Sequence, residues 1–130
     1  MITRVILLAL LSLVLSGCAT QPPRSELYDR EELSVDPEVQ FGLVVTELFQ
    51  ERLRQPSGNS LLQVAFAVEG RADTRFGWKV TWFNASGMEV PGVGKGYREA
   101  RVLPGQHRYF KATAPHPSVD SFQLHLREMR

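Results

Sequence analysis

The sequence has a single cysteine, Cys18, and no excess of either charge over its 130 residues. One cysteine cannot form a disulfide within the chain, so the fold must rest on its hydrophobic core. The formal net charge of +1 gives no sign of a polyanionic partner, and we expect no nucleic acid binding. The one long apolar run, residues 5–15, is far shorter than the ~20 residues that span a bilayer.

This apolar run has the length and position of the hydrophobic part of a signal peptide, with Arg4 just before it. The sequence Leu15-Ser16-Gly17-Cys18 that ends it resembles the lipobox of bacterial lipoprotein precursors. In that family a diacylglycerol is joined to the cysteine sulfur, and the peptide is cut just before the cysteine. We therefore expect residues 1–17 to be a lipoprotein signal peptide and Cys18 to carry the lipid. The competing interpretation is an ordinary secretory signal with an incidental cysteine.

The resemblance also implies a location. In Gram-negative lipoproteins an Asp directly after the cysteine tends to retain the protein at the inner membrane, and here Ala19 and Thr20 follow Cys18. The expected location is therefore the outer membrane, with the chain lipid-anchored and facing the periplasm. Each buried CH₂ contributes about 0.8 kcal/mol, so two or more acyl chains anchor a protein stably.

Residues 18–40 are expected to be the lipidated N-terminus and a flexible tether, because they are polar and contain three prolines. Asp-Pro-Glu at positions 36–38 is typical of a helix start. Gly42 and the Val-Val-Thr sequence that follows favour a strand instead. Whether residues 36–53 begin as helix or strand stays open, and we expect a strand over about 43–51.

Residues 41–130 show the alternation of apolar and polar residues that is typical of half-buried strands. Strands are predicted over residues 60–70, 75–84 and 119–128, with a hairpin turn at 84–87. Residues 97–105 and 106–113 are expected to pair with each other around a Pro-Gly turn. Short strands separated by turns roughly every 8–12 residues predict an all-β fold, an immunoglobulin-like antiparallel β-sandwich of about seven strands.

The central sequence, residues 61–90, resembles the YcfL-like family of small bacterial lipoproteins, and the similarity extends over about residues 43–127. In that family an aromatic pair, an Asp or Asn and then a Gly mark the end of a central strand. The matching residues here are Trp82, Phe83, Asn84 and Gly87. The resemblance implies an immunoglobulin-like periplasmic domain on a lipid anchor, and it supplies neither an enzymatic activity nor binding residues.

The residues that most often carry chemistry show no familiar spacing. His107, His116 and His125 lack the spacing of zinc ligands, and we expect them on exposed strand surfaces. His107 facing His125 across two strands is the alternative. The sequence Pro91–Tyr97 is similar to a phosphate-binding loop, but it lacks the spacing and the helix of one, so we interpret it as a loop.

Aromatic side chains offer a second candidate. Trp78 and Trp82 are four residues apart in a predicted strand, so they share a face. We expect both in the core of the sandwich. The alternative is a platform on which sugars stack, formed with Tyr97, Tyr109 and Phe110.

Basic side chains offer a third candidate site. Arg98, Arg101, Arg108 and Lys111 lie on two strands that are expected to be adjacent. They would form a basic strip for anionic lipid, cell-wall carboxylates or a partner. The default interpretation is a solvated strand edge, where charge prevents edge-to-edge association.

No nucleophile elbow, catalytic carboxylate pair or Cys/His arrangement appears in the sequence. We therefore predict that the protein is not an enzyme and uses no metal or other cofactor. The expected function is a non-catalytic interaction or accessory module of the cell envelope, attached to the membrane through Cys18 and bound to an envelope protein. The alternatives are a peptidoglycan-binding module and a small envelope hydrolase.

Replacement of the cysteine tests the lipobox. Cys18→Ala is expected to leave the precursor uncut and to remove it from the outer-membrane fraction, because the sulfur is the acylation site. Membrane fractionation and electrophoretic mobility measure both effects. Ser16→Ala keeps a small residue in the lipobox and should be processed like the wild type. Unchanged fractionation of Cys18→Ala would contradict lipid attachment.

Overall fold

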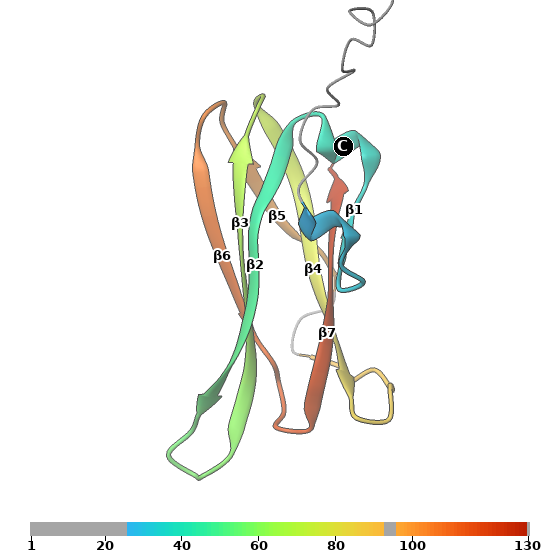
Figure 1. Cartoon of the computed structure of the whole chain (residues 1–130), viewed down its shortest axis with the longest axis vertical. Coiled ribbons are helices and arrows are strands. Elements are labelled where there is room, and N and C mark those ends of the chain that lie inside the picture. The colour runs from blue at the N-terminus through green and yellow to red at the C-terminus, as the bar shows by residue number, and fades with distance from the viewer. Residues whose placement is uncertain (1–25, 93–95, 130) are drawn as a thin grey trace, which may run out of the picture.

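Seven strands form two β-sheets that pack face to face in the computed structural model, which describes residues 26–92 and 96–129 (Figure 1). The strands are β1 Leu33–Val35, β2 Leu43–Arg54, β3 Ser60–Gly70, β4 Thr74–Asn84, β5 Arg98–Val102, β6 His107–Thr113 and β7 Val119–Glu128. One sheet has the order β1-β7-β4-β5 and the other β2-β3-β6. All neighbours are antiparallel except β1, which runs parallel to β7. The predicted all-β sandwich is confirmed.

The core follows from the period-two pattern of these strands. Every second residue of β3 from Leu62 to Val68 is buried, and so are Phe122, Leu124 and Leu126 of β7. In β4 the same pattern buries Phe76, Trp78 and Trp82, and Val80 is partly buried. Phe66 joins the two sheets, because its ring centroid lies 5.2 Å from that of Trp78 in β4 and 5.0 Å from that of Phe110 in β6. Trp78 and Trp82 are 5% and 7% exposed, so the expectation that both lie in the core is confirmed.

The expected flexible tether is wrong over residues 26–40. These residues form a 3-10 helix η1 at Glu26–Asp29, then β1, and then the short helix α2 at Pro37–Gln40. Leu33 pairs with Leu124 of β7 and is buried, as is Val39. The sandwich therefore begins before residue 41, because Leu33 of β1 and Val39 of α2 both belong to its core. The signal peptide, the lipobox and Cys18 lie outside the residues described.

The segment that the sequence left open contains both a helix and a strand. Pro37 occupies the first turn of α2, and the helix ends where the Gly42 N–H donates to the Val39 carbonyl at 3.0 Å. β2 then runs further than predicted, to Arg54. In the part of the chain described, no helix is long and apolar enough to cross a bilayer.

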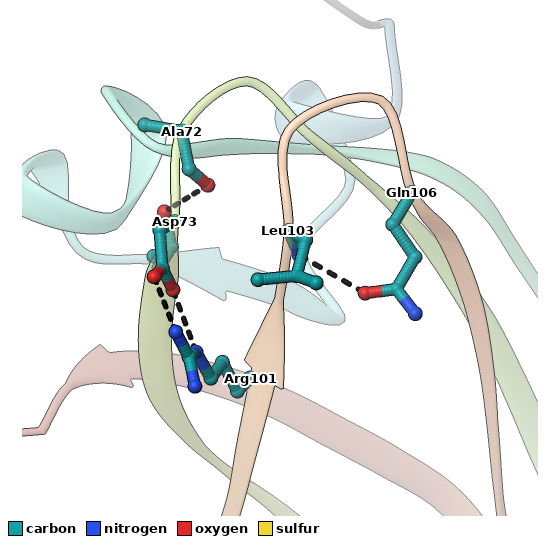
Figure 2. Close-up of polar contacts among 6 residues, drawn as sticks. Ala72, Asp73, Arg101, Leu103 and Gln106 are labelled. Carbon is teal, nitrogen blue, oxygen red and sulfur yellow. Dashed lines mark hydrogen bonds and ion pairs between the residues drawn. The ribbon is translucent and has the colours of Figure 1, made fainter.

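The predicted pairing of residues 97–105 with 106–113 is wrong. β5 pairs with β4 and β6 pairs with β3, so the chain between them crosses from one sheet to the other. The crossing is held against the end of β3, where the Gly70 N–H donates to the Gln106 carbonyl at 2.9 Å. A Cβ atom on Gly70 would collide with the Leu103 carbonyl oxygen. Figure 2 shows that the Leu103 N–H also donates to the Gln106 side chain, at 3.0 Å.

Replacement of Leu33 tests whether the N-terminal segment belongs to the folded domain. Leu33→Ala is expected to lower the free energy of unfolding by roughly 2–5 kcal/mol, the usual loss for a buried leucine. Denaturant unfolding of the mature chain measures it. Ser34→Ala is the matched control, because Ser34 is exposed on the same strand and should change little. Equal stability of Leu33→Ala and wild type would show that residues 33–35 do not stabilise the sandwich.

Candidate functional site

The edge of β4 that faces β5 is paired at both ends but not in the middle. β5 pairs with Thr74–Trp78, and beyond the next turn Glu89 bridges to Phe83. Among the residues described, no strand lies beside Lys79–Thr81 on this side. These three residues cover about 10 Å of strand. The edge strand of this sheet is therefore interrupted.

Val80 turns its backbone groups toward this interruption. The Trp82 carbonyl points to this edge, because it accepts a hydrogen bond from the Val90 N–H at 2.8 Å. The backbone groups of a strand point to its two edges alternately, so the N–H and C=O of Val80 also face this side. Within the described part of the chain, no strand residue is opposite them.

A groove of about 760 Å³ lies at this interruption, and we call it the β4 groove. Its volume is typical of small-ligand sites, which range over roughly 300–1,000 Å³. The residues that line it are Trp78–Trp82 of β4, Glu89–Gly92, Gly96–Arg98, and Ala112, Thr113 and Pro115 from the segment that begins in β6. The two tryptophans contribute little exposed area but form apolar lining beside Val80.

Tyr97 lines the groove and is held in place by a chain of hydrogen bonds. Its hydroxyl lies 2.6 Å from Nδ1 of His125, and Nε2 of His125 lies 2.8 Å from a carboxylate oxygen of Asp36. An ionised carboxylate only accepts, so Nε2 donates to Asp36, and in the neutral ring Nδ1 accepts from Tyr97. The chain connects β1, β7 and the start of β5, and it fixes one side of the groove.

Cations gather at the Tyr97 side of the groove. The Arg127 guanidinium lies 3.7 Å from the centroid of the Tyr97 ring, and the Lys79 ammonium lies 5.9 Å from it. The Arg98 guanidinium lies 5.0 Å from the centroid of the Trp78 ring. Such contacts attract a cation to the face of an aromatic ring. Lys79 and Arg98 form no ion pair with any residue described, so both charges are available to a ligand.

The other end of the groove is acidic. Glu89 lines it there, and it forms no ion pair within the described residues. Asn84 shapes this end, because its side-chain oxygen accepts the N–H of Ser86 and of Met88, each at 3.0 Å. Gly87 completes the turn with φ of 78°, which only glycine adopts readily. The hairpin turn predicted at 84–87 is present, and it brings Glu89 beside the groove.

The candidate residues named from the sequence do not come together in the structure. Trp82 lines the groove, whereas Phe83 points to the opposite face of β4 and Tyr109 lies exposed on the other sheet. His107 and His125 are on strands of different sheets, so the alternative that they face each other is wrong. Over residues 26–92 and 96–129, no three His, Cys, Asp or Glu side chains are placed to share a metal ion.

The expected adjacency of the two strands is wrong, because β5 and β6 belong to different sheets, so the alternative of a basic strip across them is not formed. Arg101 of β5 instead forms a two-contact ion pair with Asp73, in which its Nε lies 2.7 Å from one carboxylate oxygen (Figure 2). Arg108 of β6 donates to the Arg101 carbonyl at 2.7 Å. Of the four basic residues, only Arg98 lines the groove.

Sequence reasoning missed Val80, Lys79 and Glu89, which line the groove, and the contact between Asp36 and His125. Val80 and Lys79 lie in a predicted strand, and nothing local distinguishes a paired strand edge from a free one. Asp36 and His125 are 89 positions apart, so no spacing pattern connects them.

Comparison with known proteins gives a family and a fold. The model of the family described as "Protein of unknown function (DUF1425)" matches residues 33–128. No protein of curated function matches the chain. Among solved structures, Campylobacter jejuni cj0090 is similar over 77% of this chain and 100% of its own, with a TM-score of 0.63 and 15% identity. A DUF1425 family member from Shewanella sp. pv-4 is 17% identical over 68% of this chain and 97% of its own, with a TM-score of 0.49.

The Asp73–Arg101 pair gives a prediction about pH. Hydrogen bonding from Arg101, together with its positive charge, lowers the pKa of the Asp73 carboxyl below its ordinary value. A carboxyl whose pKa is lower in the folded state stabilises the fold above the unfolded pKa, and this contribution is lost as the pH falls through the folded pKa. Arg101→Gln should therefore raise the pKa of Asp73, as measured by NMR titration of its side-chain carbon. Arg52→Gln, on a different ion pair, should leave it unchanged. An Asp73 pKa unaffected by Arg101→Gln would contradict this.

Proposed function

This chain belongs to the DUF1425 family of proteins of unknown function, and from that premise we propose that it is a lipid-anchored, non-catalytic binding module of the cell envelope, like the YcfL-like lipoproteins that its sequence resembles. The lipid on Cys18 holds the sandwich at the periplasmic face of the outer membrane. The β4 groove binds an extended segment of an envelope protein there.

The observation that carries this proposal is the β4 groove, a hollow beside the part of the β4 edge that has no strand partner among the described residues. An exposed strand edge is a template for pairing with another chain. Proteins use it to recognise extended peptides, with main-chain hydrogen bonds supplying affinity and side-chain pockets supplying specificity. Here this part of the edge lies beside Trp78 and Trp82, so a bound segment would also bury apolar surface.

The corrected start of the domain supports a position close to the membrane. The 3-10 helix η1 contains Glu26, which follows Cys18 by eight positions in the sequence. Eight residues span at most about 28 Å when fully extended. A lipid on Cys18 would therefore keep the sandwich near the bilayer, where the ligand must also be found.

The two alternatives, a peptidoglycan-binding module and a small envelope hydrolase, receive less support. Peptidoglycan binding was expected to use exposed aromatic rings, and Trp78 and Trp82 expose only 5% and 7% of their surface. A hydrolase would be favoured by a buried carboxylate in a cleft. Among the described residues no charged side chain is buried.

Photo-crosslinking in living cells tests the proposed function. A photoreactive amino acid in place of Thr81, which lines the groove, is expected to trap one envelope protein reproducibly, identified by mass spectrometry. The matched control is the same amino acid in place of Gln123, the cross-strand partner of Thr81 on the same face of the sheet but outside the groove lining. The native, lipidated protein is used throughout.

The outcomes are distinct. An adduct at position 81 that is absent at position 123 supports a protein ligand in the groove. The same products from both positions would show non-specific contact and contradict the groove as the binding site. Glycan recovered at position 81 without protein would replace the proposed partner with peptidoglycan.

A further inference from the structure

We propose that two copies of this chain form a two-fold dimer through the outer face of the sheet β2-β3-β6, with β2 of each copy against β6 of the other (Figure 1). We call this surface the β3 face, and it consists of the side chains of these three strands that point away from the core. The proposal goes beyond the proposed function, because it concerns a surface other than the β4 groove. It is carried by exposed aromatic side chains and by a charge pattern that is complementary to itself.

Two alanines form the middle of the β3 face. Every second residue of β3 from Leu62 to Val68 belongs to the core, so Ala65 and Ala67 point to the other side of the sheet. Side chains opposite one another on neighbouring strands share a face. Phe49 of β2 therefore flanks Ala65, and Tyr109 of β6 flanks Ala67. Because the alanine side chains are short, the two aromatic rings rise above them on either side.

The two aromatic side chains are exposed to a degree that is unusual for strand residues of this kind. Phe49 is 48% exposed and Tyr109 is 65% exposed. Aromatic side chains are enriched at protein–protein interfaces, where they supply much of the binding energy. Phe49 has no polar atom to interact with water, so its burial against a partner surface stabilises a complex. The β3 face therefore has the apolar centre that an interface needs.

Charge is divided across the β3 face. Glu47 and Glu51 lie on β2, on either side of Phe49, and neither forms an ion pair with any residue described. Lys111 lies on β6, and it too has no ion-pair partner in the part of the chain described. One side of the face is therefore acidic and the other side is basic.

This division selects the direction of the symmetry axis. In a closed two-fold dimer the same surface of both copies forms the interface. An axis that runs along β3 places β2 of one copy over β6 of the other, and residues of one row then oppose each other. Phe49 and Lys111 belong to one row, because both pair with Ala65. The Lys111 ammonium of one copy therefore lies over the Phe49 ring of the other, a favourable contact.

The flanking charges strengthen this contact. The Lys111 ammonium in that position lies between Glu47 and Glu51 of the opposing β2, and unlike charges attract. The two-fold axis repeats the arrangement, so each contact occurs twice. An axis across the strands would instead oppose the two β2 strands, and their glutamates would repel one another. The charge pattern therefore favours the axis along the strands.

The same axis is compatible with the proposed lipid anchor, and this step and the next rest on the proposed function. Rotation about an axis along the strands keeps the N-terminal segments of both copies at the same level along the strands. The lipids of both copies can then enter one membrane. Rotation about an axis across the strands would place the two segments at opposite ends of the dimer, where one membrane could not hold both.

The size of the β3 face predicts a weak dimer. Its three strands, over about five residues each, cover roughly 250 Å². A standard interface buries about 800 Å² of accessible surface on each partner. Confinement of two anchored copies to one membrane raises their effective concentration, as a linker between two binding modules does. We therefore expect the dimer on the membrane and not in dilute solution.

Cysteine crosslinking in living cells tests the dimer with the native, lipidated protein. Gln63→Cys places a thiol on β3, where the axis brings the two copies of residue 63 together. A short, membrane-permeant bismaleimide is expected to give a covalent dimer of this chain, identified by electrophoresis and by mass spectrometry of the joined peptides. Gln123→Cys is the matched control, because it places the same thiol on the outer face of β7 in the other sheet, and it should give no dimer. The wild type reports any reaction of Cys18 itself.

Charge reversal tests the arrangement of the strands. In the Gln63→Cys protein, Lys111→Glu is expected to lower the yield of crosslinked dimer roughly fivefold, because it replaces exposed ion pairs by repulsion. Glu47→Lys with Glu51→Lys should lower it similarly, and the combination of all three changes should restore it. Arg71→Glu is the control for charge alone, because Arg71 lies in the exposed turn after β3 and should leave the yield unchanged.

The results separate as follows. A dimer from position 63 but not from position 123, lost and restored by the reversals, supports the proposal. No dimer, or the same yield from both positions, would overturn it. Crosslinks from position 63 to a different envelope protein would overturn it too, because the partner would then not be a second copy. A dimer that the reversals leave unchanged would overturn the placement of β2 against β6. Fractionation of Cys18→Ala tests the lipid anchor separately, and crosslinks from position 81 test the groove.

Discussion

The contact between Phe66 and Trp78 is the interaction on which the rest of the molecule depends. The two rings come from different sheets and meet edge to face, 5.2 Å apart. Burial of two large aromatic side chains against each other holds the sheets together. This matters here because the single cysteine cannot form an internal disulfide. Trp78 also supports Arg98 and lines the β4 groove. The packing that holds the sandwich closed therefore also positions the charged end of the groove.

The sequence predicts those elements whose structure depends on residues that are close together in the chain. Alternation in residues 60–70 and 75–84 predicts β3 and β4, because one buried face imposes a period of two on each strand. The Asn84–Gly87 turn is also local, since a side-chain oxygen and a positive φ are properties of single residues. These elements form as expected because their stabilising contacts lie within a few positions of the residues that make them.

The remaining elements depend on contacts between distant positions. β1 is only Leu33–Val35, and it is a strand because β7, some 90 positions later, offers it an edge. The sequences of β5 and β6 are typical of a hairpin. Because Gly70 has no side chain, the segment between the two strands packs directly against the end of β3, and the strands join different sheets. The Asp36–His125–Tyr97 chain has the same origin. Period and turn signals report nothing about such partners, so these features and the groove they build were not predictable.

An interrupted edge has a different consequence from an open one. A long free edge pairs with any extended chain, which makes it an aggregation hazard. Here β5 and the segment at Glu89 close both sides of Lys79–Thr81, so another sheet cannot dock along β4. The interruption is short, so any strand pairing there would contribute little affinity. Selection would then depend on the charged and apolar residues that line the groove. The same interruption that protects the sheet therefore makes the groove selective.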